Sequence, residues 1–117
     1  MSEVLQEFLE ANLPVAGLAA WGLRQADGRV LARCCNQNFA PKQMEELVSA
    51  LWNAGKGLEP HGLQPLRACW VFERARLYLA LRGEGAGLAL LVENRPDFAS
   101  TEIERILETF VQMPRTW

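Results

Sequence analysis

The residues able to carry acid–base or nucleophilic chemistry are few and scattered along this chain. His61 is the only histidine, and it lies in a segment rich in proline and glycine. A catalytic histidine works with a nucleophile and an orienting carboxylate, and no such pair stands at a recognisable spacing from His61. We therefore interpret His61 as an exposed loop residue. No catalytic site is expected, and the chain is not predicted to be an enzyme.

The glycine-rich stretch GEGAG, residues 83–87, invites comparison with a phosphate-binding loop. A P-loop continues with Lys and Ser or Thr and leads into a helix, whose first N–H groups hold the phosphate. Here the Lys-Ser/Thr pair is missing, and the residues that follow, 88–93, form an apolar run typical of a strand. The pattern favours a flexible hairpin turn and predicts no cofactor.

The charged side chains show no arrangement that indicates catalysis. Arg74 and Arg76 fall in a predicted hairpin turn. An arginine in such a turn can enter the nucleotide site of a partner, as arginine fingers do. An exposed arginine is the simpler interpretation, because nothing in the sequence orients these two. The paired or clustered acids fall on the polar faces of predicted helices, where carboxylates are solvated: Glu45, Glu46, Glu102, Glu104 and Glu108.

Three cysteines, Cys34, Cys35 and Cys69, lie in apolar runs that are predicted strands. Cys34 and Cys35 are adjacent, so their side chains point to opposite faces of a strand. An odd number of cysteines, with neither CxxC spacing nor a nearby histidine, favours free thiols and predicts no metal site. We interpret them as small core residues of a protein in a reducing compartment. Redox sensing or metal capture is the alternative.

Length and composition limit the class of protein. A chain of 117 residues fits one domain, residues 1–117. Its 50% apolar and 22% charged residues are typical of a folded domain. The net charge is −2 and the basic residues are spread out, so nucleic acid is not an expected partner. The acidic start MSEVLQEFLE is unlike a signal peptide, and no apolar run approaches the ~20 residues that span a bilayer. We expect a cytoplasmic protein that does not insert into membranes.

The spacing of apolar residues predicts three helices and five strands. The helices are expected at residues 3–12, 41–55 and 101–113, and the strands at residues 16–23, 30–35, 66–72, 77–82 and 88–93. Asp27 and Gly28 give a strong hairpin signal between the first two strands. Thr101 and Glu104 form a plausible capping box for the last helix.

The first strand is apolar on both faces, with Leu18 and Ala20 on one and Ala19, Trp21 and Leu23 on the other. It is therefore expected at the centre of the sheet, covered on both sides. Strands joined mainly by tight turns favour an antiparallel sheet, and helices on both faces give three layers. The predicted fold class is α/β in the broad sense and α+β in the strict one, in the order α-β-β-α-β-β-β-α. The first and third helices are expected on one face and the middle helix on the other.

The strand at residues 66–72 begins the run of three strands, so it is expected at the rim of the sheet. Both its faces are apolar: Leu66, Ala68, Trp70 and Phe72 on one, Cys69 and Val71 on the other. Natural edge strands are protected by charge, proline or a bulge, and the centre of this strand has none of these. A second copy that pairs with it would join two sheets, with the two middle helices packed above the seam. We predict a homodimer, with a related chain as the alternative partner.

Three segments together resemble the roadblock/dynein light chain family, a small α/β fold related to longin domains. They are GLAAWGLRQADGRVLA, PKQMEELVSALWNAG and CWVFERARLYLALRGEGAGLALLVE. The resemblance covers nearly the whole chain. It rests on a hydrophobic pattern, an Asp-Gly turn and a glycine-bearing loop before the last strand.

The resemblance implies a non-enzymatic protein that dimerises through the middle helix and the third strand. It also implies a regulator or scaffold for Ras-like small GTPases, including bacterial polarity and gliding switches. Carried onto this sequence, the implied dimer and partner surface is Met44, Leu47, Val48, Leu51, Trp52, Cys69, Trp70 and Val71. Trp52 has no counterpart that the resemblance leads us to expect. It is either a partner anchor, since tryptophan is enriched at interface hot spots, or a cap on the core.

Two other functions fit a small acidic α/β protein. Secretion chaperones are dimers that hold an extended client on apolar patches, but they place three strands before the middle helix, whereas two are predicted here. A sensor domain would hold a small ligand in a pocket between sheet and helix. The sequence does not identify the GTPase or say whether exchange or hydrolysis is affected.

Overall fold

The computed structural model describes residues 2–13, 17–35, 40–57, 59–62, 67–82, 85–94 and 100–113. Its elements follow the predicted order with one short 3-10 turn added: α1 (Ser2–Asn12), β1 (Leu18–Arg24), β2 (Val30–Cys34), α2 (Pro41–Lys56), η1 (Glu59–His61), β3 (Arg67–Val71), β4 (Ala75–Leu81), β5 (Gly87–Glu93) and α3 (Ser100–Gln112). The predicted helices and strands are confirmed, and their ends shift by at most two residues. Leu66 and two residues of the GEGAG stretch, 83 and 84, lie outside the described residues.

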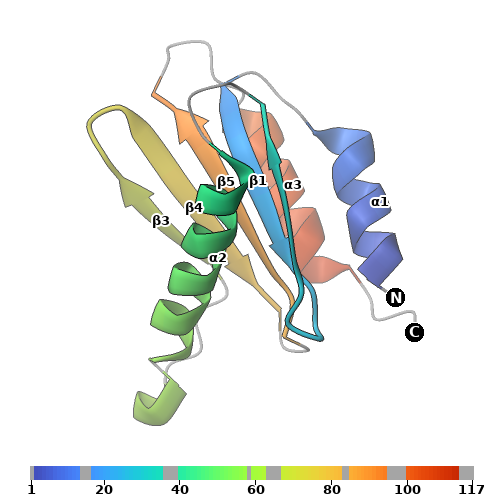
Figure 1. The fold of residues 1–117 in the computed structure, drawn as a ribbon, viewed down its shortest axis with the longest axis vertical. Helices are drawn as coiled ribbons and strands as arrows, with labels where there is room; N and C mark the ends of the chain where they lie inside the picture. The colour runs from blue at the N-terminus through green and yellow to red at the C-terminus, as the bar shows by residue number, and fades with distance from the viewer. Residues whose placement is uncertain are drawn as a thin grey trace.

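The five strands form one antiparallel sheet in the order β2-β1-β5-β4-β3 (Figure 1). Strand β1 lies inside the sheet between β2 and β5, and six of its seven residues are buried. As predicted, β1 is apolar on both faces because it lies inside the sheet and is covered on both sides. Strands β3 and β2 form the two rims of the sheet.

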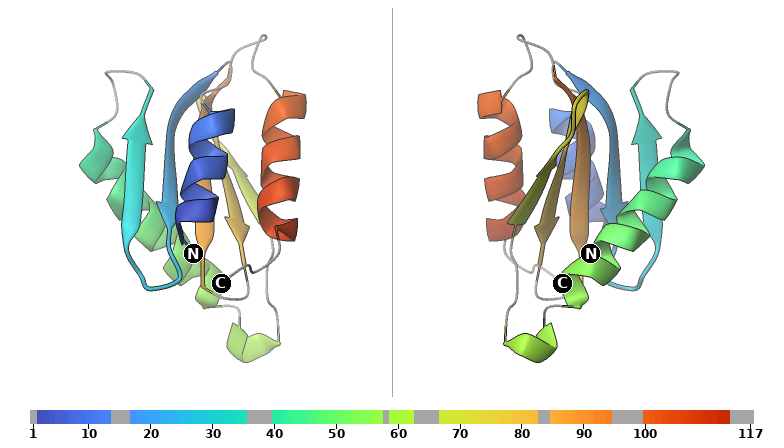
Figure 2. Two further views of the ribbon diagram at one scale, coloured as in Figure 1. Left: turned by 90° about the vertical axis from the view of Figure 1, so that its right-hand side faces the viewer. Right: turned by 90° about the vertical axis from the view of Figure 1, so that its left-hand side faces the viewer.

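Helices cover both faces of the sheet, which gives the three layers that the sequence predicts (Figure 2). Helices α1 and α3 lie on one face, and α2 lies on the other. The core under α1 and α3 is the larger: Leu9, Leu13, Leu18, Trp21, Leu23, Tyr78, Ala80, Ala86, Leu88, Leu90, Val92, Ile103, Ile106, Leu107 and Phe110. The core under α2 is smaller: Ala20, Ala32, Met44, Val48, Leu51, Leu77, Leu79, Leu81 and Ala89.

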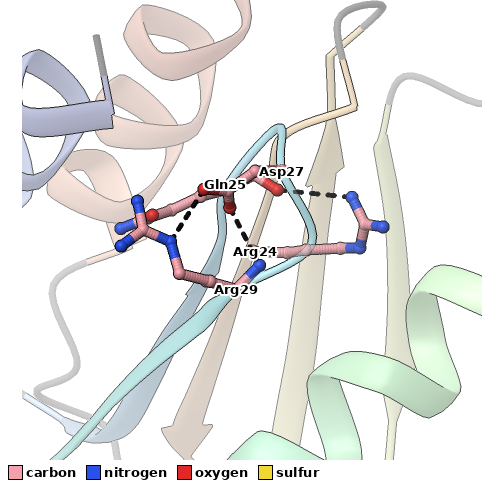
Figure 3. Close-up of polar contacts among 4 residues, drawn as sticks. All are labelled: Arg24, Gln25, Asp27 and Arg29. Atoms are coloured by element: carbon pink, nitrogen blue, oxygen red, sulfur yellow. Dashed lines mark hydrogen bonds and ion pairs between the residues drawn. The ribbon is translucent and has the colours of Figure 1, made fainter.

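The turn between β1 and β2 forms where Asp27 and Gly28 predict it (Figure 3). The Gln25 N–H donates to the Arg29 carbonyl at 2.7 Å, and the Gly28 N–H donates to the Gln25 carbonyl at 2.9 Å. Gly28 has a φ of +95°, which glycine adopts without steric cost. The Asp27 carboxylate accepts hydrogen bonds from the main-chain N–H and the side-chain Nε of Arg29. These bonds lower the pKa of Asp27.

The predicted faces of β1 are wrong at Leu18. A β-bulge lies between Leu18 and Ala20, so that Leu18 is paired with Val92 whereas Ala20 is paired with Leu91. The extra residue reverses the alternation of side chains at this point. Leu18 therefore packs in the core under α1 and α3, on the opposite face from Ala20.

The predicted capping box of the last helix is also wrong. Helix α3 begins at Ser100, so Thr101 lies inside its first turn rather than before it. The Glu104 carboxylate forms an ion pair with Arg67 of β3.

The cysteines are less buried than the sequence led us to expect. Cys34 is half-buried, and both Cys35 and Cys69 are exposed. Cys69 lies on the rim strand β3, and Cys35 follows the other rim strand, β2. Rim positions lack a neighbour on one flank, which explains why these apolar runs are not core throughout. Partial burial still raises the pKa of each thiol.

Candidate interaction surface

The outer edge of β3 pairs with no other strand among the described residues. Strand β3 pairs with β4 on one side, and its other side faces outward between α3 and α2 (Figure 2, right). The two large hydrophobic side chains that are exposed among the described residues lie at the end of this strand. Val71 is 68% exposed and Phe72 is 54% exposed. Such an edge is a template for pairing with another chain.

The register of β3 with β4 decides which face each side chain joins. Cys69 stands opposite Tyr78, so it lies on the face that carries α1 and α3. Trp70 stands opposite Leu77, on the face that carries α2. The predicted alternation of β3 is therefore confirmed. Trp70 is half-buried, whereas Cys69 is exposed.

An apolar groove separates α2 from the outer strands. Helix α2 packs mainly on β2 and β1, which leaves the side of the sheet near β3 without a full helical cover. The resulting hollow is open and measures about 480 Å³. Its lining combines one flank of α2 with β4, β5 and the residue that follows β3: Gln43, Glu46, Leu47, Phe72, Leu77 and Leu91.

The predicted surface residues of α2 divide into two groups. Met44, Val48 and Leu51 are buried between α2 and the sheet of the same chain. They hold α2 in place, and their own side chains are not free to meet a partner. Leu47 is half-buried at the edge of this core and lines the groove. The apolar stripe of α2 therefore packs in the core along one side and lines the groove along the other.

Trp52 packs against two cationic side chains of its own chain. The guanidinium of Arg24 lies 4.0 Å from the centroid of the Trp52 ring, and the Lys56 ammonium lies 5.0 Å from it. Arg24 also donates from Nη1 to the carbonyl of Gly85 at 2.5 Å. Trp52 therefore joins the end of α2 to the end of β1 and to the turn before β5. These contacts match the core-capping alternative rather than a free anchor.

The sequence places Phe72 on an apolar face of the rim strand, but Phe72 is not part of the predicted dimer and partner surface. Its carbonyl accepts a hydrogen bond from the Asn94 side-chain amide at 2.8 Å, and the Glu73 carbonyl accepts another from the same amide at 3.2 Å. The main-chain N–H of Asn94 donates to the Arg74 carbonyl. The turn between β3 and β4 is thus held by the residue that follows β5. The only sequence signal was an aromatic residue at the end of an apolar rim strand.

Among the other residues considered from the sequence, the acids Glu104 and Glu108 are not simply solvated, because both pair with Arg67 of β3. His61 is exposed in η1, and Arg74 is exposed in the turn after β3. In the described part of the chain, no group of three His, Cys, Asp or Glu side chains is placed to hold a metal ion. Within the same residues, no helix is long and apolar enough to cross a bilayer.

This combination of a five-stranded antiparallel sheet and three helices is the fold of roadblock/LC7 domains, as the sequence resemblance implies. A roadblock/LC7 domain from Streptomyces avermitilis superposes with a TM-score of 0.63 and 18% identity, covering 95% of this chain and 88% of its own. No family model matches the chain, and no curated protein matches it.

The fold is also that of MglB proteins. The gliding protein MglB from Thermus thermophilus gives a TM-score of 0.68 at 20% identity, covering 93% of this chain and 87% of its own. A second MglB, described with a tetrameric arrangement, gives a TM-score of 0.69 at 21% identity. The match covers 94% of this chain and 84% of that MglB chain. What this chain shares with them at such identities is the fold.

Proposed function

We propose that the chain forms a homodimer through β3 and α2, and that this dimer is a non-enzymatic cytoplasmic adaptor. It binds a Ras-like small GTPase and modulates the nucleotide cycle or the localisation of that GTPase. The observation that carries the proposal is the uncovered rim strand β3, where Val71 and Phe72 are exposed beside an apolar groove. The GTPase as partner is supported by the resemblance to the roadblock family and by the fold shared with a gliding protein.

The geometry of the rim supports the proposed dimer. If two β3 strands pair antiparallel about a two-fold axis, the outward-facing main-chain N–H and C=O groups of each strand form hydrogen bonds with the other. With the axis at the centre of the strand, Cys69 faces its own copy and Arg67 faces Val71. On the α2 side, Trp70 then packs beside Ala68 of the second copy. Helix α2 of each protomer borders the seam, and the groove beside Leu47 receives the other helix.

The dimer is tested by light scattering after gel filtration. The protomer mass is 13.1 kDa, so the wild type is expected at 2 × 13.1 = 26.2 kDa. Val71→Lys places a charge on the rim without disturbing a core position, because Val71 is 68% exposed. It is expected to run as a monomer. Cys35→Lys places the same charge beside the opposite rim and is expected to remain a dimer.

The GTPase assignment is tested with purified Ras-like GTPases from the same organism. Release of a fluorescent guanine nucleotide and hydrolysis of GTP are each measured with and without the wild-type dimer, and complex formation is followed by gel filtration. A stable complex, or a change in either rate, is expected with the wild type and is expected to be lost with Val71→Lys. Unchanged rates with no complex formed would contradict the GTPase assignment while leaving the dimer intact.

The order of strands separates this proposal from a secretion chaperone. Two strands precede α2 and three follow it, whereas the chaperone order places three strands before the middle helix. The groove beside α2 is open along the seam rather than enclosed between helix and sheet, which suits a protein partner better than a small ligand.

A further inference from the structure

The second rim of the sheet, strand β2, also has an outer edge. The Gln25 N–H donates to the Arg29 carbonyl and the Cys35 N–H donates to the Ala19 carbonyl, in the register that pairs β1 with β2. In an antiparallel ladder, such hydrogen-bonded pairs alternate with pairs whose main-chain groups point away from each other. The N–H and C=O groups that point outward from β2 are therefore those of Val30, Ala32 and Cys34. No other strand among the described residues pairs with this edge.

The two faces of β2 differ in their cover. On one face its side chains pack beneath α2. On the other face stand Leu31 and Arg33, because they are paired with Leu23 and Trp21 of the larger core. Helices α1 and α3 lie over the inner strands and leave this face of β2 open (Figure 2, left). Leu31 is half-buried there and Arg33 is exposed.

Arg33 closes part of this edge with its own side chain. Its Nη1 donates to the carbonyl of Ala32 at 3.1 Å, and that carbonyl is one of the outward-facing acceptors. Within the described residues, Arg33 forms no ion pair. A carboxylate on a neighbouring strand would draw the guanidinium away, because a hydrogen bond between two charged groups is stronger than one to a neutral carbonyl. The Ala32 carbonyl could then accept an N–H from that strand.

The arginines of β2 disfavour pairing with a second copy of the same strand. Depending on the register, two antiparallel β2 strands would set Arg33 opposite Arg29, Leu31 or Arg33 of the second copy. Like charges directly opposite each other are destabilising, and Leu31 offers a guanidinium no acceptor. The same positions favour a strand that carries an acid where β2 carries an arginine.

We propose that β2 binds an extended acidic segment of a partner protein, which adds to the sheet as a further strand. The segment runs antiparallel to β2, with Asp or Glu opposite Arg33 and an apolar residue opposite Leu31. Main-chain hydrogen bonds to Val30, Ala32 and Cys34 supply affinity, and the two side-chain contacts supply specificity. This surface does not depend on the β3 dimer, because β2 lies at the other rim of the sheet. A dimer therefore offers two such sites.

A labelled peptide with the central sequence Glu-Val-Val-Val-Thr provides the test. Fluorescence anisotropy at about 0.15 M salt is expected to show one peptide per protomer. Arg33→Glu should weaken binding about tenfold or more, because it sets two carboxylates opposite each other. A peptide with Lys in place of Glu should bind Arg33→Glu more tightly than it binds the wild type. Arg105→Glu makes the same charge change at an exposed site on α3, and it should alter binding less than about threefold.

Amide exchange followed by NMR locates the bound peptide. Exchange of the outward N–H groups of Val30, Ala32 and Cys34 is expected to slow, and exchange along β3 is expected to stay unchanged. Four outcomes would overturn the acidic strand and leave the proposed function intact: no binding, equal effects of Arg33→Glu and Arg105→Glu, no preference of the Lys peptide for Arg33→Glu, or slowing at β3 instead of β2. A monomeric chain that binds the peptide at β2 would refute the dimer and support this site.

Discussion

Val48 of α2 packs directly on the backbone of β1 at Gly22. A Cβ at Gly22 would lie 2.4 Å from Cγ2 of Val48, a separation far inside van der Waals contact. The absence of a side chain at Gly22 therefore sets how closely α2 approaches the sheet. Gly22→Ala is expected to lower the free energy of unfolding by about 1–3 kcal/mol, the usual cost of overpacking a core. Urea denaturation followed by circular dichroism measures it.

The double variant Gly22→Ala/Val48→Ala is expected to recover part of the loss, because it removes the methyl group that collides. Gly57→Ala is the control, since Gly57 has helical φ and ψ angles and its added Cβ would meet nothing closer than 3.4 Å. Its effect should stay below about 1 kcal/mol. If both single variants cost the same, the close approach at Gly22 does not position α2.

Arg82 fixes the end of α3. It is buried, its Nη1 donates to the carbonyl of Phe110, and its guanidinium lies 5.6 Å from the centroid of the Phe110 ring. A cation near the last carbonyls of a helix also interacts favourably with the helix dipole. Arg82→Met keeps the aliphatic stem and removes the donor, so it should cost about 1.5–3 kcal/mol of unfolding free energy. Thermal and urea unfolding measure the loss.

Arg105→Met is the matched control on α3, because the Arg105 side chain is about half exposed and pairs with Glu102. An exposed pair of this kind contributes roughly 0–1 kcal/mol. Equal effects of the two substitutions would show that the Arg82 contact is not what anchors the helix.

The elements of this fold could be predicted from local pattern, because each depends on spacing within a few residues. The helical stripe beginning at Met44 and the Asp-Gly turn are of this kind, and the rim position of β3 follows from its place at the start of a run of strands. The bulge at Leu18 could not be predicted. Both faces of this strand are apolar, so an inserted residue does not change its hydrophobic pattern.

The candidate surface could be predicted only in part, for a physical reason. An apolar stripe on a helix does not show which of its residues face the core, and the structure buries Val48 while it leaves Leu47 at the groove. Contacts between distant segments have no local signal either. The pair of Arg67 with Glu104 and the bonds from Asn94 to the turn after β3 join residues 37 and 21 to 22 positions apart.

Asn94 is expected to support the dimer from outside the interface. Asn94→Ala removes the two hydrogen bonds to the carbonyls of Phe72 and Glu73, which loosens the turn that presents Val71 and Phe72. The two bonds together contribute about 1–3 kcal/mol to ordering the turn in each protomer, so the dimer dissociation constant should rise by at least roughly fivefold. Sedimentation equilibrium over a dilution series measures it.

Asn53→Ala is the control for this prediction, because Asn53 is exposed on α2 and contributes no side-chain bond to the β3 turn. It should leave the dissociation constant within about twofold of the wild type. A dissociation constant unchanged by Asn94→Ala would mean that the turn keeps its shape without these bonds.

The register of the proposed dimer can be read from Cys69. With the two-fold axis at the centre of β3, the two Cys69 residues stand opposite each other, and directly opposed Cβ atoms lie about 4.5–5.5 Å apart. A short bis-maleimide is therefore expected to link two protomers covalently. Cys69→Ser should abolish the product on a denaturing gel. Cys34→Ser/Cys35→Ser should retain it, because those residues lie at the opposite rim.

The rate of this cross-link should depend on pH in a definite direction. Burial raises the pKa of the Cys69 thiol, so near pH 7 the thiol is almost wholly protonated, and the thiolate is the reactive form. The rate should rise about tenfold per pH unit from pH 7 and level off only above the ordinary thiol pKa. A rate that levels off below pH 8 would contradict the environment assigned to Cys69. A cross-link through Cys35 instead would place the dimer seam at β2 and refute the β3 dimer.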